Sequence, residues 1–230
     1  MDCRDIAAAA GRHGLLLRGG FHCLAGDSIP DLPGGRPAAT LVLLGNAGSS
    51  LWAAFSSGPE WLDGAPDPLD RWSARVIGAL ATQLGAAALF PFGGPHYHPF
   101  QRWALKAEPV APSPIGMLIH PVYGLWHAYR GALAFAETLT LPPRGEAPVP
   151  CESCREKPCL SSCPVDAFGT SGYGVGVCVN HIVTQAGQDC MTLSCRARRA
   201  CPVGREYLYQ AEQAGFLMEA FLSARLKQKD

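Results

Sequence analysis

The sequence has no excess of charge of either sign, because 19 basic residues balance 19 acidic residues among its 230. Proteins whose main task is to clamp a polyanion usually carry a clear basic excess, so nucleic acid is not an expected partner. The first residues, MDCRD, include acidic side chains and begin no apolar run of signal-peptide length. The long uncharged stretches are interrupted by Pro, Gly, Asn or Gln, which a lipid-facing helix would avoid. A cytoplasmic protein with no membrane partner is therefore expected.

Cysteine is scarce in the first 150 residues, where only Cys3 and Cys23 occur, and dense in the last 80, which hold the other eight. In a reduced compartment such a density indicates metal binding rather than a disulfide scaffold.

The sequence also lacks nucleotide-binding motifs. The predicted strands are not followed by a dinucleotide fingerprint, and the GNAGSS turn at 45–50 lacks the lysine of a phosphate loop.

Apolar patterning predicts an α+β fold in two domains. Four prolines in the segment 141–150 indicate a semi-rigid linker, so we expect domains at 1–141 and 151–230 joined by a Pro-rich linker at 142–150. Turn signals and apolar periodicity predict strands at 14–23, 38–45, 86–90, 115–119 and 128–137, and helices at 68–86, 100–107 and 205–227. The last helix is expected to pack back onto the body of the protein.

Two cysteine runs, each ending in Cys-Pro, dominate the second domain. The first run, CESCREKPCLSSCP at 151–164, resembles the cluster-binding run of bacterial two-cluster ferredoxins, whose fourth cysteine ligates the other cluster. The second run, CMTLSCRARRACP at 190–202, follows the lone Cys178. Crossed ligation on that pattern assigns one 4Fe–4S cluster to Cys151, Cys154, Cys159 and Cys201, and the other to Cys178, Cys190, Cys195 and Cys163.

Two other interpretations of the cysteines stay open. Two zinc sites of four cysteines each would also use eight thiolates, although zinc ribbons favour paired two-residue gaps. A single cluster with some cysteines free is the other alternative, and three gaps are each two residues longer than in the ferredoxin pattern. The arginines at 196, 198 and 199 either offset the charge of the thiolates or form a dock for an acidic partner or phosphate.

The residues IGMLIHPVYGLWHAYRG at 115–131 of the first domain follow the pattern Gly-x-x-Ile-His-Pro-x-aromatic-Gly-x-Trp-x-Ala-x-Arg-Gly. This pattern resembles that of the cobalamin-processing CblC (MMACHC) family. The resemblance implies a nitroreductase-like α/β sandwich and a corrinoid pocket built from Gly116, His120, Tyr123, Gly124, Trp126 and Arg130. The glycines would admit the flat ring, the aromatic residues would wall it, and the arginine would pair with a peripheral group.

For three of these residues a second role stays open. Trp126 is equally explained as core, Arg130 as a salt-bridge partner, and His120 as a hydrogen-bonding residue rather than a cobalt ligand.

The order of the two domains is similar to that of epoxyqueuosine reductase and, more distantly, of reductive dehalogenases, which combine a cobalamin with two 4Fe–4S clusters. The expected architecture is therefore a nitroreductase-like domain followed by a bacterial-type ferredoxin module and a C-terminal helix. We expect an iron–sulfur oxidoreductase that takes electrons from an external reductase, flavodoxin or ferredoxin and reduces a bound corrinoid. The alternatives are a non-catalytic electron or cobalamin carrier, a cobalamin-dependent reductase of an organic or tRNA-borne substrate, and an enzyme with FMN in place of the corrinoid.

Overall fold

The computed structural model describes residues 2–94, 97–170 and 172–227. The chain divides by its contacts into two compact units. The first unit is Met1–Pro109 with His127–Glu146, and the second is Val110–Trp126 with Ala147–Asp230.

The segment Val110–Trp126 lies in the second unit, whereas the sequence analysis placed it in the first domain. It forms a hairpin whose short strands are β4 (Ala111–Pro112) and β5 (Leu118–Ile119). Apolar side chains of this hairpin and of the segment around the last cysteine form one core cluster, and this packing joins the hairpin to the second unit. The buried members of the cluster are Ile115, Ile119, Leu125, Ala197 and Cys201.

The first unit is built on a four-stranded antiparallel sheet in the order β1-β2-β6-β3. Its strands are β1 (Leu16–His22), β2 (Thr40–Ala47), β3 (Ala87–Leu89) and β6 (His127–Phe135). Every residue of β2 is buried, as the uninterrupted apolar run predicts for a strand covered on both faces. Register places Leu43 opposite Ala132 and Leu41 opposite Ala134, so the centre of the sheet is wholly apolar.

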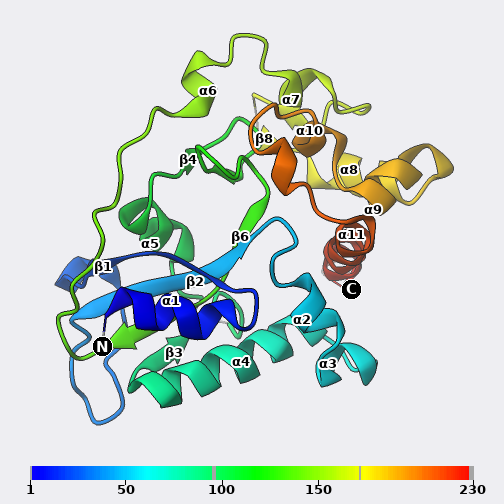
Figure 1. Ribbon diagram of the computed structural model, residues 1–230. Helices are drawn as coiled ribbons and strands as arrows, with labels where there is room; N and C mark the ends of the chain where they lie inside the picture. The colour runs from blue at the N-terminus through cyan, green and yellow to red at the C-terminus, as the bar shows by residue number, and fades with distance from the viewer. Residues whose placement is uncertain (1, 95–96, 171, 228–230) are drawn as a thin grey trace. The chain divides into compact units, whose positions relative to one another are not determined.

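Helices cover both faces of this sheet. They are α1 (Cys3–Gly11), α2 (Trp52–Ser56), α3 (Pro59–Leu62), α4 (Pro68–Leu84) and α5 (Phe100–Ala107), with a 3-10 turn at Ala25–Asp27. Figure 1 shows α5 on one side of the sheet and α1 with α4 on the other, and α4 contacts both β3 and β6. The observed α4 begins with Pro68 in its first turn and ends at Gly85 in a left-handed conformation, which are the signals that predict it from sequence.

The second unit consists of short helices and hairpins. Its remaining elements are α6 (Pro150–Ser153), α7 (Pro158–Ser161), β7 (Phe168–Gly169), β8 (Gly172–Tyr173), α8 (Val175–Ile182), α9 (Gln188–Leu193), α10 (Arg196–Arg199) and α11 (Ala211–Leu226), with 3-10 turns at Gln185–Gly187 and Arg205–Tyr207. The terminal helix α11 packs against α9 and buries Gln213 and Ala214.

Glycine is required where the hairpin 110–126 meets the loop after the last cysteine. A Cβ on Gly124 would lie 2.0 Å from the carbonyl oxygen of Val203, and Gly124 has φ +57°. A Cβ on Gly204 would lie 2.4 Å from the backbone of Tyr123. A side chain at either position would force these two backbone segments apart.

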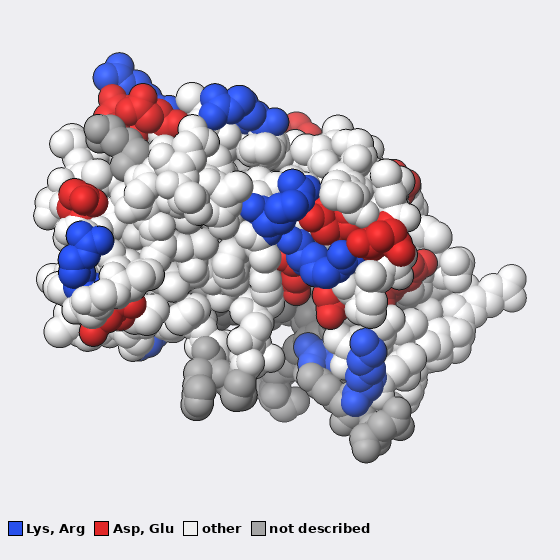
Figure 2. Space-filling view, turned by 90° about the horizontal axis from the view of Figure 1, so that it is seen from below, with Lys and Arg blue, Asp and Glu red and all other residues white. Residues whose placement is uncertain are grey.

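None of the helices in the described part of the chain is both long and apolar enough to cross a membrane. On the face shown in Figure 2, basic and acidic side chains are interspersed among a larger number of neutral ones. This mixture agrees with the zero net charge of the sequence.

Candidate iron–sulfur centres

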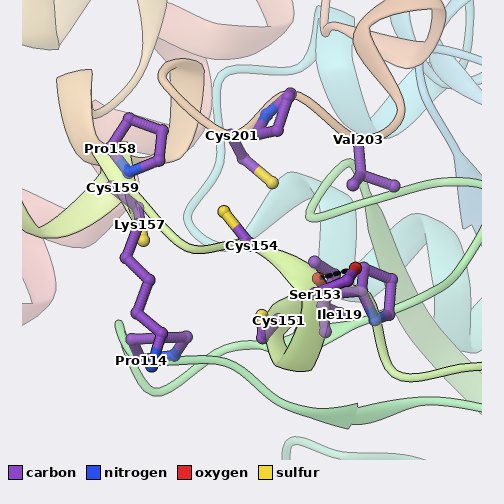
Figure 3. A pocket seen from close by; sticks show the side chains of 12 residues that line it. Pro114, Ile119, Cys151, Ser153, Cys154, Lys157, Pro158, Cys159, Cys201 and Val203 are labelled. Carbon is purple, nitrogen blue, oxygen red and sulfur yellow. Dashed lines mark hydrogen bonds between the residues drawn. The ribbon is translucent and has the colours of Figure 1, made fainter.

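Four cysteines from two distant parts of the sequence surround one hollow in the second unit. This first cysteine set is Cys151, Cys154, Cys159 and Cys201. The hollow has a volume of about 280 Å³ and is walled by prolines and by Ile119 of the hairpin. In Figure 3 the sulfur atoms of Cys154 and Cys201 point toward one another across it.

Prolines set the geometry of the first run. Pro150 begins α6 and Pro158 begins α7, each at a first-turn position where the missing N–H is tolerated. Between the two helices, Lys157 adopts a left-handed conformation with φ +40°, which reverses the chain so that Cys159 returns toward Cys154. The four residues between these cysteines, two more than in the ferredoxin pattern, form this turn.

Burial is the main cause of raised thiol pKa values in the first set. It raises the pKa of Cys151, and the neighbouring sulfurs raise it further, while the nearby Lys157 opposes the shift. Burial also raises the pKa of Cys201, opposed by the backbone N–H of Val203 and by the charge of Arg205. The free thiols of Cys151 and Cys201 stay protonated at neutral pH, so binding of a metal cluster there must release protons.

A second hollow is lined by the other four clustered cysteines. This second cysteine set is Cys163, Cys178, Cys190 and Cys195. The backbone N–H of Ala167 donates to the sulfur of Cys163 at 3.3 Å, and the hydroxyl of Tyr173 hydrogen-bonds the sulfur of Cys178. Burial and the adjacent thiols raise the pKa of Tyr173, so its hydroxyl keeps the proton that it donates.

The two sets are crossed between the two runs. Cys163 closes the first run but lies with the second set, and Cys201 closes the second run but lies with the first set. These are the groups that the ferredoxin pattern predicts, including the lone Cys178. That they bind iron stays a prediction.

Donor type and number in both sets fit a 4Fe–4S cluster, which takes four thiolates. The first hollow also has room, whereas the second has a volume of about 20 Å³ and would have to widen around a cluster. Among the described residues, no three His, Cys, Asp or Glu side chains converge on a point where a single metal ion could sit. A tetrahedral zinc site needs its ligands at about 2.0–2.3 Å from one ion, a different arrangement from that of a cubane.

The arginines beside the second set hydrogen-bond to other residues of the protein. Arg196 makes two 2.7 Å hydrogen bonds to Asp189, and Arg199 makes a third of 2.5 Å, which lowers the pKa of Asp189 to about 2. Arg198 donates to the carbonyl of Leu125 at 2.7 and 3.1 Å and lies 4.4 Å from the ring of Trp126. They tie α10 to its surroundings and do not form an open basic dock.

Most of the residues expected to hold a corrinoid have partners within their own unit. Trp126 is 1% exposed and packs edge-on against Tyr209 at 5.3 Å, so it is core. His120 is buried, accepts the backbone N–H of Val122 at 3.0 Å through Nδ1, and stacks on Tyr123 at 4.3 Å. These side chains hold the hairpin together.

The two glycines of the expected pocket lie in turns or against backbone, and its arginine forms an ion pair. Gly116 lies in the open turn between β4 and β5, and Gly124 faces the backbone of Val203. Arg130 belongs to the first unit, where it donates to Asp70 at 2.5 Å and to Ser73 at 3.0 Å. That these residues bind a corrinoid stays a prediction.

Sequence reasoning missed a buried polar network in the first unit. Arg18, 1% exposed, donates to both carboxylate oxygens of Glu108 at 2.6 and 3.2 Å, and to the carbonyl of Asn46 at 2.9 Å. The hydroxyl of Tyr129 donates to the same carboxylate, and burial together with that charge raises the pKa of Tyr129. His127 lies 3.1 Å from Arg18. The only sequence signal was an arginine between apolar residues of a predicted strand.

The chain shares the fold of epoxyqueuosine reductase. A crystal structure of the selenomethionine-labelled epoxyqueuosine reductase matches 90% of this chain and 67% of that chain, with a TM-score of 0.52 and 14% identity. A structure of epoxyqueuosine reductase with an epoxyqueuosine-modified tRNA-Tyr stem loop matches 92% of this chain and 68% of that one, with the same TM-score and identity. No known protein family and no curated protein matches the sequence.

The similarity to epoxyqueuosine reductase that the domain order indicates is thus confirmed at the level of the fold. The mixed α+β class with an antiparallel sheet is also confirmed. The resemblance to the CblC family, the nitroreductase-like detail and the ferredoxin module stay predictions.

Proposed function

We propose that the protein is an iron–sulfur oxidoreductase that reduces an organic or tRNA-borne substrate with electrons carried by two 4Fe–4S clusters. The observation that carries this proposal is the crossed arrangement of two four-cysteine sets, each around its own hollow. The shared fold with epoxyqueuosine reductase supports a reductase. Clusters of this type supply single electrons at low potential when bound.

The residues of the chain have distinct tasks in this proposal. The first cysteine set holds one cluster, and Lys157 and Arg205 offset the negative charge of its thiolates. The second cysteine set holds the other, with hydrogen bonds from Ala167 and Tyr173 to its sulfurs. A two-electron reduction would draw its electrons one at a time from an external donor such as a reductase, flavodoxin or ferredoxin, and its protons from solvent.

This proposal ranks reduction of an external substrate above reduction of cobalamin itself, which the sequence analysis favoured. The resemblance to cobalamin-dependent reductases keeps a corrinoid as a proposed cofactor, with FMN as the alternative. The residues that we expected to bind it are engaged elsewhere, so we assign no step to a corrinoid at those positions.

A tRNA-borne substrate is now a candidate, although charge balance argued against nucleic acid. The fold neighbour was solved with a tRNA stem loop, and its chain is longer than this one. Zero net charge is compatible with a local basic patch, and contacts to a few phosphates position a nucleic acid without reading its sequence.

The test begins with anaerobic purification and assay of iron, sulfide and zinc. We expect about eight iron atoms per chain, and stoichiometric zinc without iron would refute the proposal. The loaded protein, reduced by a chemical donor, is then incubated with an epoxyqueuosine-modified stem loop, and the product is measured by mass spectrometry. Cobalamin and FMN are titrated separately and followed by visible spectroscopy. Cys154→Ala should abolish turnover, and Cys23→Ala, outside both sets, serves as the control.

A ferredoxin-type electron carrier is the second candidate. It is favoured by one observation: all eight clustered cysteines and the walls of both hollows belong to the second unit. A carrier would exchange electrons with a redox protein at full iron loading, yet turn over neither the stem loop nor cobalamin.

A further inference from the structure

His181 lies in the wall of the second hollow, beside the four cysteines of the second set. It is on α8, three residues after Cys178, so the two side chains share one face of that helix. Its Nε2 atom is buried and, among the described residues, has no hydrogen-bond partner. This is the one ring nitrogen beside either cysteine set, within the described residues, that is left in this state.

A buried polar atom without a hydrogen-bond partner is costly. Leaving such a group without a partner costs about 1–3 kcal/mol, so folded proteins seldom retain one without a reason. The four cysteines of the second set line the same hollow as His181, and so does one basic side chain, Arg196. A cluster bound there would present both thiolate and sulfide sulfur atoms as acceptors.

The protein already directs donors at other sulfurs of the second set. The N–H of Ala167 donates to Cys163, the hydroxyl of Tyr173 to Cys178, and the backbone N–H groups of Ala197 and Arg198 to Cys195. The imidazole of His181 can act in the same way, and its Nε2 has no partner among the described protein atoms.

We infer that His181 is a positioning residue whose Nε2–H donates a hydrogen bond to a sulfur of the second cluster and raises the reduction potential of that cluster. The inference rests on the proposed function, since it requires iron at the second set. Reduction adds one negative charge to a cluster, and a hydrogen bond to a more negative acceptor is stronger. The donor therefore stabilises the reduced form more than the oxidised form.

The first measurement uses the unmodified sequence. The full chain is purified anaerobically with ¹⁵N-labelled histidine, reduced, and examined by pulsed electron paramagnetic resonance. A weak ¹⁵N coupling to one cluster is the expected result, because the nitrogen reaches the cluster through a hydrogen bond. A strong coupling would show direct iron ligation and overturn the inference, as would the absence of any histidine coupling.

The second measurement is a redox titration of variants. His181→Leu removes the donor, and at a fixed potential we expect the ratio of reduced to oxidised second cluster to fall about tenfold, or about 59 mV for a one-electron couple. His181→Gln places an amide N–H near the same position and should recover most of that shift. His13→Leu, a histidine of the first unit, should leave both potentials unchanged.

Iron content separates failure of this inference from failure of the proposed function. If the unmodified protein binds no iron at the second set, the cluster proposal fails there and the inference fails with it. If the second cluster is present and His181→Leu leaves its potential unchanged, the inference is wrong and the proposed function stands.

Discussion

Cys163 and Cys201 each lie with cysteines from the other run, so when the first set is already disabled, the choice of which of the two is removed should decide whether the second cluster survives. We compare two triple variants that share Cys151→Ala and Cys154→Ala, which together remove half of the first cysteine set. One variant adds Cys201→Ala and takes a third thiolate from the first set. The other adds Cys163→Ala and takes one thiolate from the second set instead.

With crossed ligation, the variant lacking Cys201 keeps the second set complete. It should retain about four of about eight iron atoms, in an intact cubane with an unaltered electron paramagnetic resonance signal. The variant lacking Cys163 has no complete set of four thiolates and should hold fewer iron atoms in a labile cluster. Iron and sulfide assays on anaerobic protein measure both. The reverse pattern, with the intact cluster in the variant lacking Cys163, would show sequential ligation and refute the crossed assignment.

Three further predictions concern the core and the ion pairs of the two units. Trp126→Ala should lower the free energy of unfolding by about 3–5 kcal/mol, because it empties a core position; loss of cobalamin binding at unchanged stability in urea would show that the indole is a pocket wall. Glu108→Ala should cost about 3–5 kcal/mol in the same assay, since it leaves the buried charge of Arg18 without its carboxylate, and a neutral effect would contradict the network. Arg71 holds the pKa of Asp63 down at about 2, below its value of about 3.9 in an unfolded chain. The stabilisation from that pair is therefore complete above about pH 4 and lost as the pH falls toward 2, and a carboxyl titration by NMR giving an ordinary pKa would contradict it.

The elements of the first unit were predictable because their signals are local. The continuous apolar run gives the buried β2, and Pro68 with Gly85 delimits α4. The helix predicted at 100–107 is α5, whose buried face includes Phe100 and Trp103. Each of these depends on residues a few positions apart, so no knowledge of the tertiary structure is needed.

The cysteine sets were predictable for a related reason. Spacing within a run limits which sulfurs can reach a common point, and Pro after the last cysteine turns the chain away from that point. The size of the second hollow and the position of His181 depend on how α8 packs, which spacing does not contain. Sequence therefore gave the grouping of the thiols but not the side chains that surround them.

The contacts of the expected corrinoid residues were not predictable, because residue type does not reveal whether a side chain already has a partner within the protein. An arginine beside a glycine suits an anionic ligand, but Arg130 finds Asp70 at the start of α4. A tryptophan suits a flat ring, but Trp126 packs against both Tyr209 and the guanidinium of Arg198. The partners of Arg130 and Trp126 come from segments far away in the sequence.

The structure gives Gly124 and His120 of the 115–131 passage a structural role. Gly124 has no room for a side chain because the backbone of Val203, two residues after Cys201, passes against it. His120 pairs with Gly124 across the hairpin through two backbone hydrogen bonds of 2.8 and 2.9 Å, and its ring fixes the turn between them. The hairpin in turn supplies Ile119 to the wall of the first hollow. A passage that resembles a cobalamin motif thus forms part of the support for the first cysteine set, so substitutions in it are expected to disturb the cluster before any effect on a corrinoid is measured.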